Sequence, residues 1–309
     1  MQMKCNPPMP APASPPTGAM TKAANAVPPH AWFGVSAVFH YLGPSFAVLL
    51  FPAVGVLGVA WFRIASAALI FAPVTKPWRT FHRAGNAERL LLLTLGATLA
   101  VMNTAFYLAL DELPIALVAA IEFAGTIGIA LWGLRTGRNW MALLTAILGV
   151  AVLIDVPSLF TTGGSAAFLH ILGLFWALLN GGLFVLYILL GHRISRNGAS
   201  GGIERLGAAM AAAFLFVMPI GFVQALGAFG MPTLVLAGIG VGICSSVIPY
   251  VSDQMAMSRL PRTSFALLMA LLPASATIIG AIVLRQIPTL IDLTGVALVM
   301  LGVALHRPA

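Results

Sequence analysis

Two residues that can carry a charge lie deep inside long apolar stretches of this chain. Arg63 interrupts the apolar stretch 54–75, and Glu122 interrupts the stretch 114–134. A charged side chain inside hydrocarbon costs about 2.5–3.5 kcal/mol on insertion scales, so it usually faces a cavity or a partner. If both stretches cross a membrane, both residues lie roughly 12–14 Å from the same interface. The pair predicts either a site for a substrate or a coupling proton that contains Glu122, or a structural ion pair between two helices.

Uncharged polar residues in other apolar stretches are further candidates for such a site. Asn103 and Tyr107 are one helical turn apart and therefore share a face. Asn180 lies near the middle of the stretch 168–191, and Tyr250 lies in the stretch 232–254. These side chains could bind an amino or a carboxyl group of a ligand. Hydrogen bonding between helices is an equally common use of such residues.

Two prolines interrupt apolar stretches and are candidate hinges. Pro249 and Pro273 each remove a backbone N–H and free a carbonyl, which kinks a helix. A kink can open a cavity or supply a hinge, and it can also be purely structural. Asp253 follows Pro249 within one turn, and we expect it to pair locally with Arg259 or Arg262.

The composition fixes the class of molecule that must position these residues. The chain has 309 residues, of which 60% are hydrophobic and 8% charged, and its mean hydropathy is +1.00. A typical soluble domain is about one quarter charged. Soluble enzymes, disordered regulators and fibrous proteins are therefore excluded. The fold class that remains is an all-α polytopic membrane protein.

Ten apolar stretches have about the length that a helix needs to cross hydrocarbon. If the N-terminus is cytoplasmic, fourteen of the sixteen basic residues fall on the cytoplasmic side, only Arg285 falls on the other side, and Arg63 lies within a span. This asymmetry predicts that both termini are cytoplasmic, with the lipid bilayer as partner. The expected spans are 31–51, 54–75, 89–110, 114–134, 139–155, 168–191, 205–228, 232–254, 263–284 and 288–306.

The two halves of the chain share a pattern. Apolar stretches flank the break at Asp111–Pro114 in the first half and the break at Ser258–Arg262 in the second half. Five spans is an odd number, so the second half would enter the membrane from the opposite side. We therefore expect two inverted five-helix repeats, over residues 30–155 and 156–309, which is an architecture of secondary transporters. Residues 1–29 are rich in proline, and we expect them to form a disordered cytoplasmic tail.

Several kinds of chemistry have no motif in this sequence. It contains no phosphate-binding Walker A loop, no HExxH or GxSxG motif and no TVGYG-like filter. Its two cysteines, Cys5 and Cys244, allow no metal-ligand spacing. The basic residues form no aromatic-interleaved face for nucleic acid. We expect no enzyme activity, no catalytic residues, no metal and no cofactor, and the oligomeric state stays open.

Short motifs over residues 31–306 make this chain similar to the EamA-type drug/metabolite transporter superfamily, and more closely to its bacterial threonine/homoserine exporter branch. The residues that carry the resemblance are Leu50–Pro52, Gly55, Gly58, Val59, Arg63, Lys76–Arg79, Met102, Asn103, Phe106–Leu108, Glu122, Phe123, Gly125, Tyr187–Leu189, Gly191, Arg193, Pro249, Tyr250, Arg259–Pro261, Phe265, Leu268 and Met269. The superfamily has ten spans in two inverted five-helix repeats. This chain departs from it at Leu272, where a glutamate often precedes the proline, at Arg285-Gln286, where Gly-Glu is frequent, and at Thr126, where the family has proline.

The resemblance implies an exporter of small amino acids such as threonine and homoserine, with a cavity that alternates between the two sides of the membrane. Glu122 would bind the ammonium group of the substrate or a coupling proton, and Arg63 would bind the carboxylate or keep Glu122 ionised. Asn103, Tyr107, Asn180 and Tyr250 would line the path. The alternatives are an exporter of aromatic amino acids, nucleobases or cationic compounds, or an intramembrane enzyme or lipid-handling protein.

Overall fold

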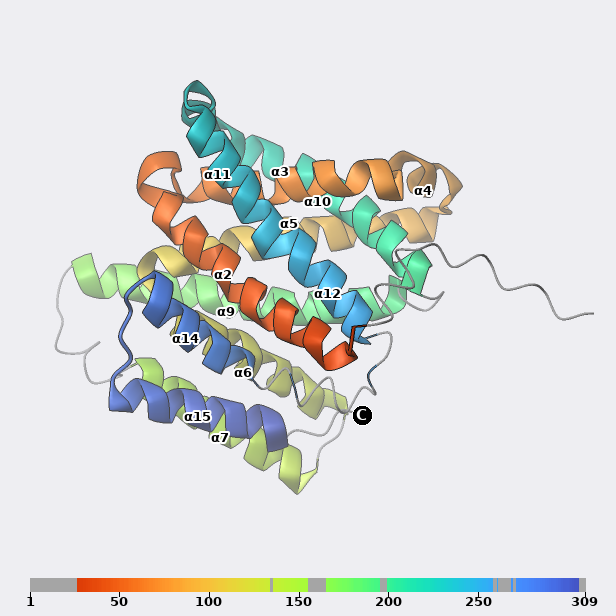
Figure 1. Cartoon of the computed structure of the whole chain (residues 1–309). Helices are drawn as coiled ribbons and strands as arrows, with labels where there is room; N and C mark the ends of the chain where they lie inside the picture. Colours follow the sequence, from red (N-terminus) through yellow and green to blue (C-terminus); the bar gives the residue numbers. More distant parts are fainter. Residues whose placement is uncertain are drawn as a thin grey trace, which may run out of the picture.

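The computed structural model describes residues 27–133, 136–154, 165–194, 199–257, 260, 268 and 271–305. Every element in this part of the chain is a helix (Figure 1). Residues 1–26 of the predicted tail, and the residues Arg259 and Arg262, lie outside the described part. The helices are α2 (Pro29–Val54), α3 (Val56–Thr75), α4 (Pro77–Arg83), α5 (Asn86–Glu112), α6 (Ile115–Gly133), α7 (Gly137–Ile154), α9 (Ser165–Ile194), α10 (Ala199–Ala225), η2 (Leu226–Gly230), α11 (Pro232–Gly242), η3 (Ile243–Val247), α12 (Ile248–Met257), α14 (Leu272–Val283) and α15 (Leu290–Leu305).

Seven helical segments of the described chain are long and apolar enough to cross a membrane. They coincide with the first three predicted spans and with the fifth to the eighth. The other three predicted spans contain shorter apolar helices, at Ile115–Gly125, Leu272–Val283 and Leu290–Leu305. The helix at Ile115–Gly125 is short because the side chains of residues 126–133 lie outside the described part. Most residues of 261–270, which precede the helix at Leu272–Val283, also lie outside it. The chain is thus an all-α multi-pass membrane protein, and the number of ten crossings stays a prediction.

Gly55 separates the first two helices. Its φ of 79° lies in a region that side chains rarely adopt, so a glycine ends α2 there and α3 begins at the next residue. The first backbone N–H groups of a helix have no partner within that helix. The side chain of Gln224, at the end of α10, accepts two of them, from Leu57 at 3.0 Å and Gly58 at 3.2 Å. This local arrangement sets the start of the helix that carries Arg63.

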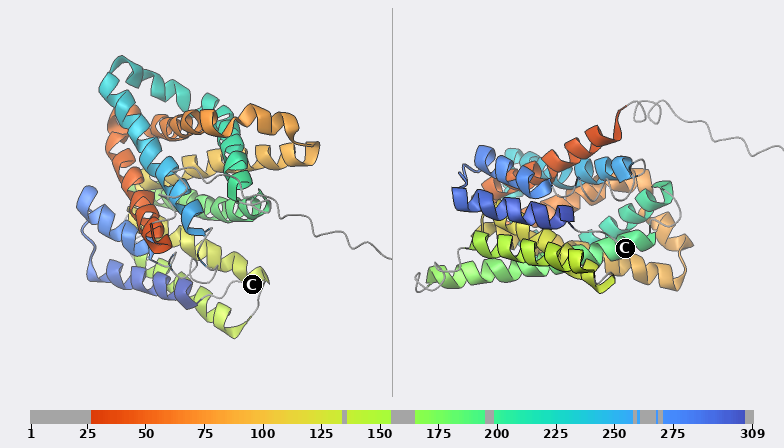
Figure 2. Two further views of the ribbon diagram at one scale, coloured as in Figure 1. Left: turned by 45° about the vertical axis from the view of Figure 1, so that its right-hand side comes forward. Right: turned by 90° about the horizontal axis from the view of Figure 1, so that it is seen from below.

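Two helix pairs form opposite edges of the molecule. α3 packs along α10 at one edge, and α7 packs along α15 at the other (Figures 1 and 2). Glycines permit the close approach of α7 and α15, because a Cβ atom at Gly149 would lie 2.6 Å from the carbonyl oxygen of Gly295. Small residues at helix contacts are the usual basis of packing in lipid, where burial of apolar surface gives little driving force.

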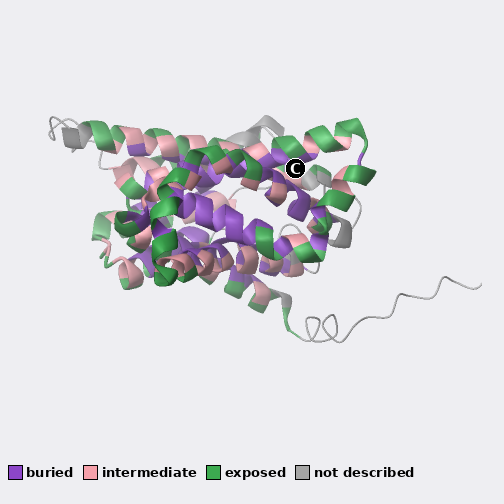
Figure 3. Ribbon diagram, turned by 90° about the horizontal axis from the view of Figure 1, so that it is seen from above, coloured by how far each residue is buried: buried purple, intermediate pink, exposed green. Residues whose placement is uncertain are grey.

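The interior lies between these edges and includes the inner faces of α3 and α5. In the most apolar window of α3 and of α5, 67% of the residues are buried, whereas the value for α7 is 22%. Figure 3 shows buried residues in the middle of the molecule and exposed ones around it. Large apolar side chains such as Leu144, Leu178 and Ile282 are exposed on the outer helices, as expected of surfaces that face lipid. The interior, rather than the perimeter, is therefore the place for a polar site.

Candidate functional site

Arg63 lies in the interior, in the middle of α3, and is 7% exposed. Its guanidinium reaches the segment η3, which is a single turn of π-helix between α11 and α12. Arg63 Nε donates to Ser246 Oγ at 3.1 Å, and Nη2 donates to the backbone carbonyl oxygen of Ser245 at 3.1 Å. Single π-turns inside helices occur frequently at functional sites. The predicted intramembrane arginine is thus anchored on the predicted eighth span.

Pro249 gives a physical reason for this anchor. In an α-helix the N–H of residue 249 would bond the carbonyl of residue 245, and proline has no N–H to donate. The Ser245 carbonyl accepts from Arg63 instead. Close packing around this segment requires small residues on the neighbouring helices, because a Cβ atom at Gly43 would lie 2.7 Å from Ser245 Cα. The freed carbonyl predicted for Pro249 is therefore used to position a charged side chain.

Gly238 and Gly242 support the same contact from the side of α11. A Cβ atom at Gly238 would lie 2.6 Å from the ring of Phe62, and one at Gly242 would lie 2.9 Å from the carbonyl oxygen of Arg63. These two glycines therefore allow α11 to lie directly against α3.

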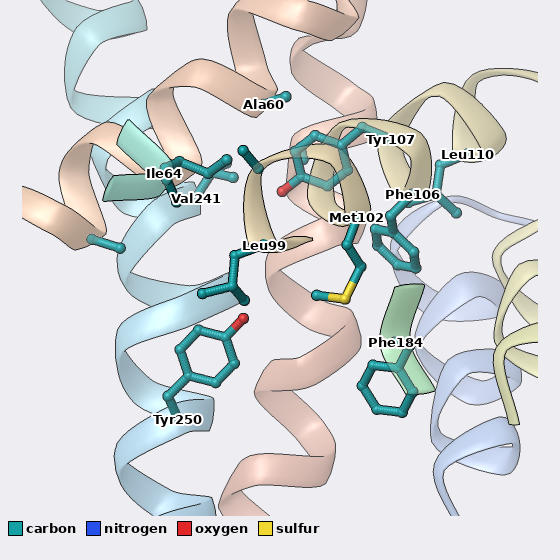
Figure 4. Close-up of a cluster of buried hydrophobic side chains, with 14 of the residues drawn as sticks. Ala60, Ile64, Leu99, Met102, Phe106, Tyr107, Leu110, Phe184, Val241 and Tyr250 are labelled. Atoms are coloured by element: carbon teal, nitrogen blue, oxygen red, sulfur yellow. The ribbon is translucent and has the colours of Figure 1, made fainter. Parts of the chain in front are cut away.

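Aromatic rings of α5 cover the guanidinium of Arg63. Its Cζ atom lies 5.3 Å from the centre of the Tyr107 ring and 5.8 Å from that of Phe106. The Tyr107 hydroxyl lies 3.4 Å from Ser245 Oγ. In Figure 4 the hydroxyls of Tyr107, on α5, and Tyr250, on α12, point toward the middle of the group of labelled side chains. A cation over an aromatic face is stabilised by the ring quadrupole, so these rings help to keep Arg63 charged inside the protein.

Glu122 lies on α6 and is 4% exposed. α9 crosses α6 closely at this point, because a Cβ atom at Gly181 would lie 3.5 Å from Glu122 Cα. The neighbouring Asn180 is 1% exposed and its side chain faces that of Glu122. Glu122 Oε2 and Asn180 Nδ2 are both buried and lack a hydrogen-bond partner within the described residues. The acid predicted to be functional is therefore buried with unused hydrogen-bonding capacity.

Arg63 and Glu122 interact electrostatically but form no ion pair with each other. The Nη1 atom of Arg63 is also buried without a hydrogen-bond partner. Leaving a charged group unsatisfied in the interior costs several kcal/mol, so such atoms call for a partner. The structural ion pair that the sequence left open is not formed in this conformation. What remains is an interior with one unused cationic donor and one unused anionic acceptor.

α2 contributes polar groups that the sequence interpretation missed. Tyr41 and Ser45 are fully buried, and their hydroxyl oxygens have no hydrogen-bond partner in the described part of the chain. Tyr41 interacts electrostatically with Glu122, and His40 with Arg63. The available signal was the spacing of Tyr41 and Ser45, one turn apart on an otherwise apolar helix.

Asn103, Tyr250 and Asp253 form a neighbouring polar group. The Asn103 amide donates to the carbonyl of Leu99 at 2.6 Å and also contacts the side chain of Tyr250. Asp253 contacts Ser36 of α2 and interacts with Tyr250. Its predicted partners Arg259 and Arg262 lie outside the described residues. The structure thus places all six candidate residues in the interior, with Arg63, Tyr107 and Tyr250 around the π-turn, and Asn180 beside Glu122.

Pro273 is placed differently from Pro249. It lies in the first turn of α14, where the missing N–H would have no intrahelical partner in any case. α14 therefore begins at this proline, and of the earlier part of the predicted ninth span only residues 268 and 271 are described. Pro273 defines where that helix starts.

Two cavities lie at opposite ends of the molecule. One, of about 450 Å³, is formed by the ends of α3, α4, α5 and α10, and the other, of about 290 Å³, lies where the α5–α6 and α14–α15 connections meet. Figure 1 shows α4 and the α14–α15 connection on opposite sides. Neither cavity includes Arg63 or Glu122. Within the described residues, no group of three or more His, Cys, Asp or Glu side chains could hold a metal ion.

Known proteins share this sequence and this fold. The profile of the EamA-like transporter family matches residues 171–306. The threonine/homoserine exporter RhtA of Escherichia coli (strain K12) is 34% identical over 251 residues, which cover 81% of each chain. The threonine/homoserine exporter RhtA of Salmonella typhimurium (strain LT2) is 33% identical over 259 residues, which cover 84% of this chain and 82% of that one.

A solved structure, described only as "Crystal structure of protein", aligns over 92% of this chain and 96% of that chain. The TM-score is 0.54 at 18% sequence identity, which is a similarity of fold. The resemblance read from the sequence is thus confirmed by relatives that match most of its length. This chain belongs to the EamA-like transporter family and resembles its threonine/homoserine exporters.

Proposed function

We propose that this chain is an inner-membrane secondary transporter that exports small amino acids, with threonine and homoserine as its first candidate substrates. The observation that carries the proposal is the pair of unused buried atoms, Arg63 Nη1 and Glu122 Oε2. An amino acid carries one carboxylate and one ammonium group, so it can satisfy both atoms at once. The names of the RhtA relatives support this class of substrate.

In this proposal Arg63 binds the carboxylate and Glu122 binds the ammonium group. Arg63 keeps two donors on the π-turn, which fixes its orientation, and it presents the third to the ligand. Hydrogen bonds to charged groups contribute about 1.5–3 kcal/mol each. The site would also discriminate against molecules that carry only one of the two charges, because the other protein group would then stay unsatisfied.

The polar residues around the two charges would bind the side chain of the substrate. Asn103, Tyr107, Asn180 and Tyr250 are all less than 9% exposed and offer amide or hydroxyl groups. The hydroxyl of threonine or homoserine needs such a partner when it is buried. Tyr41 and Ser45 of α2 add two unpartnered hydroxyls.

We infer that the chain consists of two inverted five-helix repeats, over residues 30–155 and 156–309. The largest helix contacts support this arrangement. They keep their pattern when the helices of the two halves are exchanged in the pairs α2 and α9, α3 and α10, α5 and α11–α12, α6 and α14, and α7 and α15. The contact of α5 with α9 then corresponds to that of α11–α12 with α2, and the contact of α6 with α9 corresponds to that of α14 with α2. Substrate sites of such transporters lie between the repeats.

Transport would proceed by rocking of these halves around the site, with both chain termini in the cytoplasm. Pro249 and Pro273 are the proposed hinges: Pro249 cannot form the helical hydrogen bond that would hold its turn straight, and Pro273 lies where α14 begins. If Glu122 exchanges the ammonium group for a proton, export is coupled to proton entry.

A second candidate substrate class is favoured by the aromatic residues beside the site. The rings of Phe184, Tyr187 and Tyr250 follow one another at 6.0 and 6.4 Å between centres. Such a wall would suit an aromatic amino acid, with the same use of Arg63 and Glu122. Competition by phenylalanine against threonine efflux would separate the two classes, because a small polar site excludes the larger ring.

Efflux of threonine tests the proposal. Cells that lack amino-acid exporters are loaded with a threonine-containing dipeptide, and the appearance of external threonine is followed. We expect the wild-type chain to accelerate efflux and Glu122→Gln to reduce the initial rate at least tenfold at equal abundance. Glu112→Gln, the same substitution at the end of α5, is the matched control and should keep the wild-type rate.

Two results would contradict the proposal. Equal efflux with and without the wild-type chain rejects threonine as a substrate. Full efflux by Glu122→Gln at normal abundance rejects the assignment of the site. Measurement of the protein in the membrane fraction separates a loss of activity from a loss of expression.

A further inference from the structure

A charged pocket lies at one end of the molecule, away from the central site. It has a volume of about 450 Å³ and is formed by the end of α3, by α4, by the start of α5 and by the start of α10 (Figure 1). The charged residues that line it are Lys76, Arg79, Arg83, Arg205, Glu88 and Glu204. None of them takes part in the transport site proposed above.

Contacts between the helices hold this pocket in shape. Arg205 of α10 pairs with Glu88 of α5 through Nε and Oε1 at 2.6 Å. Arg89 donates to the carbonyl oxygens of Phe81 at 2.9 Å and His82 at 3.4 Å, which ties the end of α4 to α5. α10 also lies directly against α3 here, because a Cβ atom at Gly207 would lie 2.6 Å from Thr75 Cβ. The walls are therefore formed before any ligand binds.

The pocket holds more positive than negative charge. Arg205 is neutralised by Glu88. Within the described residues, the exposed side chains of Lys76, Arg79 and Arg83 form no hydrogen bond or ion pair, while Glu204 supplies the one remaining negative charge of the lining. Cations that are gathered without partners attract an anion, and guanidinium groups match the oxygen geometry of a phosphate.

Exposed apolar side chains lie in and near the pocket. Val74 of α3 lines it and is 77% exposed, and Leu69, five residues earlier on the same helix, is 67% exposed. Leu90 of α5, two residues after Glu88, is 66% exposed. Trp78, between the cationic residues Lys76 and Arg79, is 53% exposed, and tryptophan is enriched at the boundary of membrane and water. The pocket therefore opens where an apolar surface meets a cationic one.

We propose that this pocket binds the headgroup of an anionic phospholipid. Arg79 and Arg83 hold the phosphodiester, Lys76 adds a third positive charge, and the acyl chains lie along the exposed apolar side chains of α3 and α5. A soluble anion would use the cations alone and leave the apolar border without a role. The lipid would link the turn between α3 and α4 to α10, and so stabilise the end of the helix that carries Arg63.

Native mass spectrometry of the purified full-length chain, stripped of lipid in detergent, tests the proposal by titration with phosphatidylglycerol. The variant Arg79→Gln/Arg83→Gln is compared with Arg193→Gln/Arg285→Gln, which loses the same charge at exposed positions outside the pocket. Each basic residue near an anionic lipid contributes about 1 kcal/mol, so we expect the first variant to bind roughly 30-fold more weakly. The second variant should stay within twofold of wild type.

Further arms identify the ligand and exclude a folding defect. The variant Arg79→Lys/Arg83→Lys keeps the charge but loses the guanidinium geometry, so its affinity should lie between those of the wild type and the glutamine variant. Phosphatidylcholine should bind all variants equally. The proposal would be overturned if Arg79→Gln/Arg83→Gln and Arg193→Gln/Arg285→Gln bound phosphatidylglycerol equally well. It would also be overturned if Arg79→Lys/Arg83→Lys lost as much affinity as Arg79→Gln/Arg83→Gln. If inorganic phosphate at the lipid concentration displaces phosphatidylglycerol completely, the site is one for a soluble anion and the lipid assignment is wrong.

Discussion

Arg63 and Glu122 define the central site at the scale of single residues. Each is buried, each carries one polar atom without a partner, and the two form no ion pair. Two opposite charges in a low-dielectric interior attract each other strongly, so their separation has to be maintained by other contacts. For Arg63 these contacts are Ser245, Ser246 and two aromatic rings. In the proposed function, the cost of the unsatisfied atoms would be recovered when a zwitterion binds.

Replacement of Arg63 by lysine tests the geometry of the guanidinium separately from its charge. Lysine keeps the positive charge but cannot hold both Ser245 and Ser246 while a further N–H faces the substrate. We expect Arg63→Lys to reduce the ratio of maximal efflux rate to half-saturating threonine concentration at least tenfold, which corresponds to one charged hydrogen bond. Vesicles with known amounts of reconstituted protein provide the measurement.

Arg193→Lys, the same substitution at an exposed position, is the control and should behave like the wild type. If Arg63→Lys transports as fast as Arg193→Lys, the charge alone suffices and the two hydrogen bonds to the π-turn have no role in binding.

At the scale of elements, the predicted eighth span is built from three parts. α11 packs against α3 through Gly238 and Gly242, the π-turn η3 contacts Arg63, and α12 carries Tyr250. A continuous α-helix would bond its own carbonyls and offer none to Arg63. Because of the π-turn, the segment that packs against α3 also contributes to the proposed binding site.

Restoring the missing N–H should weaken this function without damage to the fold. In Pro249→Ala the new N–H can bond the carbonyl of Ser245, which then competes with Arg63 for that oxygen. We expect an unchanged or higher melting temperature in detergent, together with at least a tenfold slower efflux. Pro232→Ala serves as the control. Pro232 lies in the first turn of α11, so its missing N–H leaves no carbonyl of a helix interior free.

The opposite pattern would argue against this role for the proline. A Pro249→Ala chain that melts at a lower temperature and transports at the wild-type rate would show that the proline acts in stability alone.

At the scale of the whole molecule, two edges of closely packed helices enclose the interior that holds the site. The pairs α3–α10 and α7–α15 form these edges, and each joins a helix of the first proposed repeat to its counterpart in the second. α2 and α9 lie between them and contact helices of the other proposed repeat. The contact pattern is what a two-fold relation between inverted halves would produce.

The orientation that follows from the charge asymmetry can be measured by labelling. In a chain whose Cys5 and Cys244 are replaced by serine, a single cysteine is introduced as Arg285→Cys or as Arg138→Cys. Both positions are exposed. We expect a membrane-impermeant maleimide to label the first in intact cells, and to label the second only after the membrane is permeabilised.

Labelling of both positions from the same side in intact cells would contradict ten spans with both termini cytoplasmic. The labelling of both in permeabilised cells is the control for reactivity.

The sequence by itself determined the class of the molecule, the approximate bounds of its helices and the identity of its two intramembrane charges. These follow from local rules: an apolar stretch of about 20 residues becomes a helix, Gly55 breaks it, and a charge inside it is rare enough to be noticed. The bounds of α2 and α3 agree with the predicted spans 31–51 and 54–75 to within three residues for this reason.

Only the tertiary structure decided which groups meet. The sequence could not show that the Ser245 carbonyl holds Arg63, that Asn180 faces Glu122, or that Tyr41 and Ser45 add unpartnered hydroxyls. Nor could it show that Lys76, Arg79 and Arg83 line one pocket with Arg205, more than a hundred residues away. Helix packing in lipid depends on which small residues allow close approach, and this choice is made among all helices at once, so no single stretch of sequence contains it.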